Sequence, residues 1–323
     1  MCNRINFGAV NPGFDRDQLL LEERLSLNEG DTAINQNGPD TAVVVLGSLH
    51  YDVMVEAPHR PVKGETVTGS RWYPKFGGKG GNQAVAAKMH GANVRLIGAT
   101  GTDNFADYIH ARLKQAHISS DHVARLNSVA TGMSVAIQDA DGDYGAVIVS
   151  GANLFISPDA IENPDVWKDA GVLLLQNEVP ESLNFLAANK ARSLNMTVCL
   201  NAAPMRDMSP EFLALVDVLI VNAIEAEALG CGAINTLPAA AVAAQTLSQR
   251  FPCAIVTAGS EGVAACSSTA QIQLAARPVE VVSTHGAGDV FCGVLCAELA
   301  ANTALDAATK IANNAAADHV AEQ

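Results

Sequence analysis

The sequence predicts an α/β fold in which a large, mostly parallel β-sheet has helices on both faces and carries a small β lid. Short, nearly continuous apolar segments of strand length alternate with helical runs along the chain. Such segments are typical of a parallel sheet that is covered on both faces. Two other stretches alternate polar and apolar residues instead, which indicates a separate sheet with one exposed face.

Six apolar segments are expected to form the main sheet. In chain order they are Val43–Leu46, Val94–Ile97, Val172–Leu175, Val198–Leu200, Val218–Val221 and Ala254–Thr257. The alternating stretches cover about 53–76 and 132–150, and the second contains an Asp-Ala-Asp-Gly-Asp turn at 139–143. We expect these stretches to form a lid over the carboxyl ends of the main strands, where open α/β sheets bind ligands.

Length and composition are consistent with one large domain. The chain has 323 residues, of which 49% are hydrophobic, enough for a large core. A chain of this length has a prior of about two domains, but α/β folds often use it as one domain with an appendage. Residues 42–323 are therefore assigned to one domain with a lid. Residues 1–41 are polar and are expected to be loosely ordered, although Leu19–Leu27 could form a short amphipathic helix.

Charge and cysteine content limit the partners and the location. The net charge of −14 and the pI near 4.9 argue against nucleic acid or an anionic membrane as a partner. No apolar run reaches transmembrane length and no secretory signal is present at the start, so a cytoplasmic protein is expected. The seven cysteines are scattered without C-x-x-C, which indicates neither a disulfide framework nor a zinc site. Cys292 and Cys296 are expected to pack as small apolar residues.

The stretch Val282–Gly293 reads V-S-T-H-G-A-G-D-V-F-C-G, in which an apolar strand, a glycine turn and an aspartate precede an apolar helix. The amides of Gly286, Ala287 and Gly288 would favour negative charge at the helix N-terminus. Asp289 would face that anion, a position suited to a base that takes a proton from a hydroxyl attacking phosphorus. The alternative is that the turn only joins strand to helix and that Asp289 is an ordinary N-cap.

A second glycine-rich stretch, Phe76–Gln83, precedes the helical run Ala84–Met89. Its glycines permit a close approach of the chain, and Lys79 and Asn82 offer donors suited to polyhydroxylated ligands. The spacing G-x-x-x-x-G-K-[ST] is absent, which argues against a P-loop enzyme. A flexible glycine linker is the alternative, but the apolar helix that follows at once argues against it.

With both stretches, the chain from about Val43 onward resembles the ribokinase family, the PfkB-type carbohydrate kinases. G-G-K-G-G-N-Q is one signature of that family and T-H-G-A-G-D is the other. Further segments that resemble family landmarks are Gly151–Asn153, Leu175–Glu178, Asn201–Pro204, Asn222–Glu225 and Thr257–Gly262. The resemblance implies a ribokinase-like three-layer sandwich and an ATP-dependent kinase for a primary hydroxyl of a small sugar, with ribose as the first guess.

The resemblance also implies a role for each matching residue. Asp289 would be the general base, and the amides of Gly286, Ala287 and Gly288 would stabilise the transferred phosphoryl group. The implied sugar-binding residues are His50, Asp52, Gly78, Lys79, Gly80, Gly81, Asn82, Glu178 and Asp289. The implied nucleotide-binding residues are Asn222, Thr257, Gly259, Gly262, Gly288 and, near the adenine, Asn313.

Glu225 matches a glutamate that helps organise Mg²⁺ in the family, often through water, and Mg²⁺ suits a site with few carboxylates. Asp52 and Glu225 also have simpler interpretations, in which neither residue binds a ligand. Asp52 could be a capping or turn aspartate. Glu225 and Glu227 could be a solvated pair at a helix N-terminus.

Three features depart from the family pattern. Ser283 stands where the family usually has an aspartate that helps hold an activating monovalent cation, which puts activation by K⁺ in question. His50 stands where ribokinases usually have an asparagine that reads the sugar, so the bulkier imidazole should alter the pocket. The chain ends at Gln323 within a predicted helix, short of the segment that usually finishes the nucleotide and cation region.

Besides a ribose kinase, two other functions are therefore considered. One is another sugar or nucleoside kinase of the same family. The other is a degenerate, noncatalytic protein that binds sugar or nucleotide, which Ser283 and the short C-terminal segment suggest and which the retention of Asp289, Lys79 and Glu225 argues against. The expected partners are a small sugar and ATP. Dimers through the lid are common among ribokinase-like proteins, so a homodimer of this kind is a further expectation from the resemblance.

Overall fold

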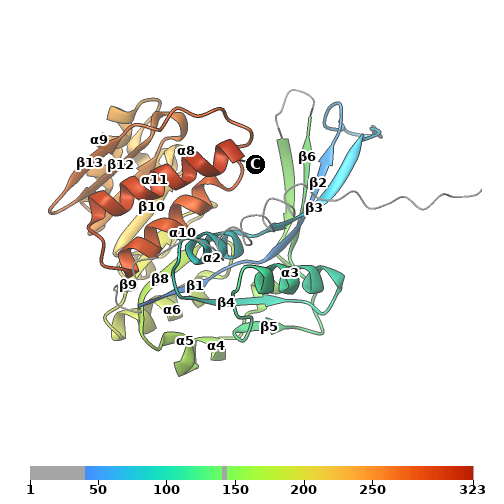
Figure 1. Ribbon diagram of the computed structural model, residues 1–323, viewed down its shortest axis with the longest axis horizontal. Helices are drawn as coiled ribbons and strands as arrows, with labels where there is room; N and C mark the ends of the chain where they lie inside the picture. Colours follow the sequence, from blue (N-terminus) through green and yellow to red (C-terminus); the bar gives the residue numbers. More distant parts are fainter. Residues whose placement is uncertain (1–40, 140–143, 323) are drawn as a thin grey trace, which may run out of the picture. The chain divides into compact units, whose positions relative to one another are not determined.

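The computed structural model describes residues 41–139 and 144–322. Residues 1–40 of the polar arm lie outside the described residues, and with them the helix expected at Leu19–Leu27. Residues 140–143, which are most of the expected turn at 139–143, also lie outside them. The described part is a three-layer α/β structure with a mostly parallel central sheet and a smaller second sheet (Figure 1). The predicted fold class is confirmed.

The main sheet has nine strands in the order β13-β12-β11-β10-β9-β8-β1-β4-β5. Their bounds are β1 Ala42–Leu46, β4 Val94–Thr100, β5 Val123–Arg125, β8 Ala170–Gln176, β9 Thr197–Asn201, β10 Val218–Asn222, β11 Cys253–Thr257, β12 Val263–Ser267 and β13 Gln271–Leu274. The six predicted segments all lie in strands of this sheet. Strand β12 runs antiparallel to both of its neighbours, β11 and β13, whereas the other neighbouring strands are parallel. Strands β5, β12 and β13 are not among the predicted strands.

Helices cover both faces because the strand residues alternate between two cores. Val44 and Leu46 of β1 face one core, and Val43 and Val45 face the other. The first core is covered by α4 (Asp159–Glu162), α5 (Pro164–Trp167), α6 (Glu181–Ser193), α7 (Pro210–Leu213), α8 (Ala223–Ala226) and α9 (Leu237–Leu247). The second is covered by α2 (Lys79–Met89), α3 (Asn104–Gln115), α10 (Ala287–Ala300) and α11 (Leu305–Glu322) (Figure 1).

Cys292 and Cys296 are buried in the second core, as predicted, and burial raises the pKa of the Cys292 thiol well above its usual range. No helix among the described residues combines the length and the apolar character that crossing a membrane requires.

The second sheet is the lid, with strands in the order β3-β2-β6-β7. These strands are β2 His50–Glu56, β3 Arg71–Gly77, β6 Met133–Gln138 and β7 Tyr144–Val149. The first stretch differs from its expected range of 53–76, because β2 begins earlier and residues 57–70 form a connection rather than a strand. Pro58 and Pro61 account for the connection, since proline cannot donate a hydrogen bond to a strand ladder.

Helix α2 begins at Lys79, inside the glycine stretch, and not at the predicted Ala84. The glycines allow this early start because the helix lies directly against the end of β1. A Cβ added to Gly80 would lie 2.5 Å from the Gly47 carbonyl carbon, and one added to Gly81 would lie 2.8 Å from the Phe76 ring. Neither position has room for a side chain, which excludes the flexible-linker interpretation.

The apolar strand expected before Thr284 is absent from the described structure. Strand β13 ends at Leu274, and the chain then runs without a strand to α10. The reason is that the Val282 N–H donates to the Val320 carbonyl of α11, at 2.8 Å, rather than to a neighbouring strand. A helix therefore positions the segment that enters α10.

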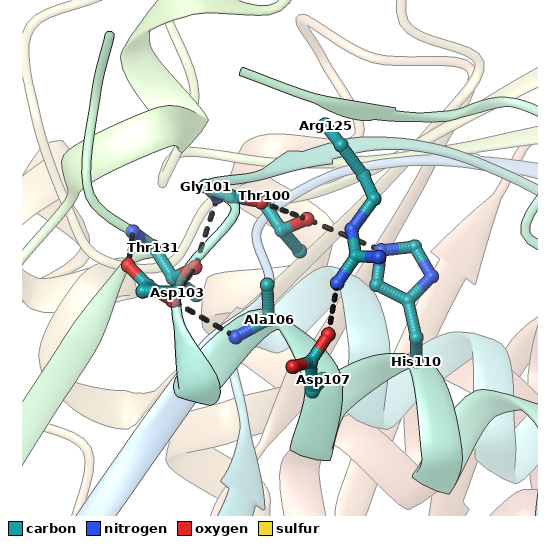
Figure 2. A network of polar contacts seen from close by, with 8 residues as sticks. All are labelled: Thr100, Gly101, Asp103, Ala106, Asp107, His110, Arg125 and Thr131. Carbon is teal, nitrogen blue, oxygen red and sulfur yellow. Dashed lines mark hydrogen bonds and ion pairs between the residues drawn. The ribbon is translucent and has the colours of Figure 1, made fainter. Parts of the chain in front are cut away.

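A polar network ties the N-terminus of α3 to the residues that enter β6 (Figure 2). Asp103 is the N-cap of α3 and accepts from the Ala106 N–H at 2.9 Å. It also accepts from the Thr131 N–H at 2.8 Å and from the Thr131 hydroxyl at 2.6 Å. Burial raises the pKa of the Asp103 carboxyl, but these hydrogen bonds outweigh burial and the net direction is downward. This carboxylate joins the lid to the main domain.

We expect Asp103→Asn to lower the free energy of unfolding at pH 7 by about 1 kcal/mol, because one oxygen becomes an NH₂ group that faces the Thr131 N–H. A carboxyl whose folded pKa is depressed stabilises the fold above its usual pKa, and this contribution is lost as pH falls through the folded value. Urea unfolding of both proteins should therefore give a difference that shrinks below about pH 4. A difference that does not change with pH would contradict this role.

Candidate active site

Asp289 lies in the first turn of α10 and is buried. The N-cap of this helix is Gly286, with φ 83°, so the interpretation of Asp289 as the N-cap is wrong. Its carboxylate accepts from Asn82 Nδ2 at 3.1 Å and from Gln83 Nε2 at 3.0 Å, both on α2. A carboxylate has about four acceptor sites, so these two amides leave capacity for a further hydroxyl donor.

A chain of buried amides fixes Gln83 in this orientation. Gln83 Oε1 accepts from Gln176 Nε2 at 2.7 Å, and Gln83 Nε2 also donates to Asn201 Oδ1 at 3.1 Å. Gln176 and Asn201 are register partners at the ends of neighbouring strands β8 and β9. None of the three was predicted as a site residue, although each lies in a segment that carries the family resemblance. Amides at the ends of adjacent parallel strands are the signal that could have identified the last two.

Lys79 lies among three carboxylates at the start of α2. Burial lowers the pKa of its ammonium group, but attraction to Asp289, Glu178 and Glu225 outweighs burial, and the net pKa is raised. The side chain is therefore held as a cation near the N-terminus of α10. The Lys79 N–H donates to Glu178 Oε2 at 2.9 Å, and the Ser48 hydroxyl donates to the same oxygen.

Asp52 lies within β2, so its interpretation as a capping or turn residue is wrong. Its Oδ1 accepts from the Ser134 hydroxyl at 2.6 Å, and a Cβ added to Gly77 would lie 1.9 Å from its Oδ2. Burial is the main influence and raises the pKa of Asp52, assisted by the nearby Glu178, while the Ser134 hydrogen bond opposes the rise. Burial destabilises the charged form of this carboxylate, and further hydrogen-bond donors would stabilise it.

His50 begins β2 and is 3% exposed. Its Nε2 has no hydrogen-bond partner among the described residues. A Cβ added to Gly132 would lie 2.6 Å from its Cδ2, so the ring is packed against the entry to β6. His50, Asp52, Lys79, Asn82, Glu178 and Asp289 therefore gather around the lid base, the start of α2 and the start of α10.

A cavity of about 490 Å³ lies at the α10 N-terminus, and none of the polar residues that gather around the lid base is among the described residues that line it. Thr257, Gly259, Gly262, Gly288 and Asn313 line it, together with Ala287 from the glycine turn. Asn313 Nδ2 donates to the Ala275 carbonyl at 3.1 Å, which holds this side chain in the wall. The cavity brings together all but one of the residues predicted to bind nucleotide.

The exception is Asn222, which is not among the described residues that line the cavity. Its side chain accepts from the Glu225 N–H at 2.9 Å, and Glu225 Oε2 accepts from the Asn222 N–H at 2.8 Å, so the two form a capping box at α8. Glu225 is buried, whereas Glu227 is exposed, so they are not a solvated pair. Burial raises the pKa of Glu225, as does Asp289, against the opposing effects of Asn222 and Lys79.

Comparisons with known proteins agree with this arrangement. The sequence profile of the family described as pfkB family carbohydrate kinase matches residues 40–322. A ribokinase from Mus musculus is 35% identical over 265 residues, covering 80% of this chain and 82% of the mouse protein. A ribokinase from Bacillus subtilis is 31% identical over 275 residues, covering 85% of this chain and 91% of the bacterial protein. The structure of Arabidopsis thaliana ribokinase complexed with ribose and ATP superposes with a TM-score of 0.79 at 28% identity. The match covers 87% of this chain and 92% of the Arabidopsis chain.

Proposed function

Because the chain belongs to the PfkB family and is a sugar kinase of the ribokinase type, we propose that it transfers the γ-phosphoryl group of ATP to a primary hydroxyl of a small sugar. Ribose is the first candidate. The observation that carries the proposal is the position of Asp289, which follows Gly288 of the cavity wall on one side and lies close to Lys79 and Asn82 of α2 on the other. Nucleotide and sugar would approach the α10 N-terminus from these two sides.

In the proposed reaction the sugar hydroxyl gives its proton to Asp289 and attacks the γ-phosphorus, and ADP leaves. Asn82 and Gln83 hold the carboxylate at the hydroxyl, because each donates to one of its oxygens. The amides of Gly286, Ala287 and Gly288 stabilise the charge that develops on the phosphoryl group, and Lys79 adds a positive charge beside it. The lid and the glycine stretch exclude water from the site.

Glu225 is the residue proposed to help hold Mg²⁺, through water. It is buried and lies close enough to Lys79 and Asp289 for each to affect its pKa. A single carboxylate near a triphosphate fits a cation that keeps several of its waters. When bound, Mg²⁺ would offset the charge of the phosphates.

The sugar pocket is proposed to consist of His50, Asp52, Gly78, Lys79, Gly80, Gly81, Asn82, Glu178 and Asp289. The names of the relatives and the ribose in the Arabidopsis complex favour ribose. The unpartnered Nε2 of His50 favours a substrate that offers it a hydroxyl, which another sugar or a nucleoside could also do. The cytoplasmic location expected from the sequence stays a prediction.

The test is ADP release from Mg-ATP across pentoses, hexoses and nucleosides. Release that depends on one substrate, with ribose the expected one, would support the proposal and identify the acceptor. A folded protein that binds sugar or ATP but releases no ADP with any acceptor would instead support the noncatalytic binding protein.

We also propose a homodimer formed through the lid. Strand β7 is an edge of the lid sheet and exposes Val147, Ile148 and Val149 by 69%, 53% and 54%. An apolar edge strand of this kind is suited to pairing with another chain. Light scattering should give twice the chain mass of 33.6 kDa.

Val147→Lys is expected to shift this dimer towards the monomer, because it places a charge on the exposed edge of the lid. Val242→Lys, at an exposed position on α9, should leave the dimer intact. A monomeric wild-type protein at tens of micromolar would contradict the proposed dimer.

A further inference from the structure

The loop that enters α10 is tied to the last turns of α11. The Val282 and Ser283 N–H groups both point to the Val320 carbonyl, at 2.8 and 3.4 Å. His319 Nε2 lies 3.0 Å from the His285 carbonyl oxygen. A Cβ added to Gly286 would lie 3.1 Å from the same Nε2, so the His319 ring lies against the N-cap of α10.

The direction of the His319 bond is fixed by its partner. A carbonyl oxygen only accepts, so Nε2 must carry the proton and donate it. The imidazole therefore presents a positively polarised N–H to the loop, immediately before the Gly286, Ala287 and Gly288 amides that are proposed to stabilise the phosphoryl group.

The same loop does not fit the monovalent cation that the family resemblance implies. Ser283 replaces the carboxylate, and its hydroxyl oxygen already accepts from the His285 N–H at 3.2 Å. The His285 carbonyl accepts from His319, and the nearby Asp318 carboxylate is paired with Arg277. The His319 N–H thus takes one acceptor site of the His285 carbonyl, the His285 N–H takes one of the Ser283 hydroxyl, and residues 282–286 contain no carboxylate. A cation held by protein needs such oxygens as ligands.

We propose that His319 is a positioning residue that fixes the α10 entry loop in place of a monovalent cation, so that turnover of this kinase does not require K⁺. The inference rests on the proposed function, because the loop amides matter through phosphoryl transfer. Asp52 accepts from Ser134 within the lid sheet, whereas the tie joins the α10 entry loop to α11. Loss of the His319 donor should therefore affect the chemical step more than sugar binding.

The first test is a K⁺ titration of the wild-type protein with the sugar that gives turnover, against choline at constant ionic strength. We expect kcat to change by less than about twofold, because Ser283 supplies no carboxylate for K⁺ and the His319 N–H already contacts the His285 carbonyl. The melting temperature, read in the same buffers, should not rise with K⁺ beyond the choline control. Activation by tenfold or more, or a K⁺-specific rise in Tm, would overturn the proposal.

The second test replaces the donor. His319→Ala is expected to lower kcat by about tenfold to a hundredfold with little change in the sugar KM, because small displacements of catalytic groups have effects of this size. His319→Gln keeps a side-chain N–H and should recover part of the loss. Lys310→Ala, at an exposed position on the same helix, is the control and should behave as the wild type.

Hydrogen exchange of the segment 282–291 provides a readout that does not depend on activity. It should be faster in His319→Ala than in the wild type and intermediate in His319→Gln. Unchanged exchange and unchanged kcat in His319→Ala would overturn the positioning role while leaving the kinase assignment intact. Absence of turnover in the wild-type protein would instead contradict the proposed function itself, and the exchange result would still decide whether His319 holds the loop.

Discussion

Asp289→Asn is expected to lower kcat by about a thousandfold or more, because general-base catalysis contributes roughly 10²–10⁴ and the charge beside the transferred group is also lost. The side chain keeps its shape, but an amide cannot take the hydroxyl proton. One of its atoms would also become an NH₂ group facing the Asn82 or Gln83 donor. Steady-state kinetics with saturating sugar and Mg-ATP measures the loss.

Sugar binding should be changed far less than turnover in this variant, and isothermal titration without nucleotide would measure it. Asp306→Asn provides the matched control, since it makes the same substitution at an exposed position in the first turn of α11. An Asp289→Asn enzyme with wild-type kcat would rule out this carboxylate as the base. A loss confined to sugar affinity would assign Asp289 to binding rather than to proton transfer.

Asp52→Ala is expected to weaken sugar binding by about a hundredfold. Two hydrogen bonds from sugar hydroxyls to this buried carboxylate, at about 1.5 kcal/mol each, correspond to that factor. The substitution also removes the acceptor of the Ser134 hydroxyl, which is buried with it. The KM for ATP should stay near the wild-type value, because Asp52 is not among the described residues that line the 490 Å³ cavity.

Glu56→Gln is the control for the Asp52 variant, since it neutralises a carboxylate at the outer end of the same strand. Equal increases in the KM for sugar and for ATP in Asp52→Ala would indicate a general disturbance of the lid. An unchanged sugar KM would remove Asp52 from the sugar pocket.

The strands of the parallel sheet could be predicted because burial on both faces makes each one a continuous apolar segment. Strands β12 and β13 form the antiparallel edge, and the Q-I-Q-L of β13 is too short and too polar to stand out. The start of α2 was misplaced because four glycines indicate a loop in the sequence, whereas here they permit contact between helix and strand.

The sequence predicts those residues of the candidate site that lie in local motifs, but not those that act through contacts between distant elements. Asp289, Lys79 and Asn82 lie in glycine motifs whose residue types already indicate phosphate and sugar chemistry. Gln83, Gln176 and Asn201 act through contacts between separate elements, and only the position of the last two amides at the ends of adjacent strands gives a sign of this in the sequence. His319 is a single histidine in an alanine-rich helix, and only the folded chain places it against Gly286.

The most direct test of phosphoryl transfer from ATP to the sugar is to follow the phosphorus of ATP by ³¹P NMR while the protein acts on ribose with Mg²⁺. We expect ADP and a phosphomonoester on the primary carbon of ribose to form in equal amounts, and neither to form with Asp289→Asn on the same timescale. Formation of ADP and inorganic phosphate without any sugar phosphate, at a rate that ribose does not change, would contradict transfer to the sugar.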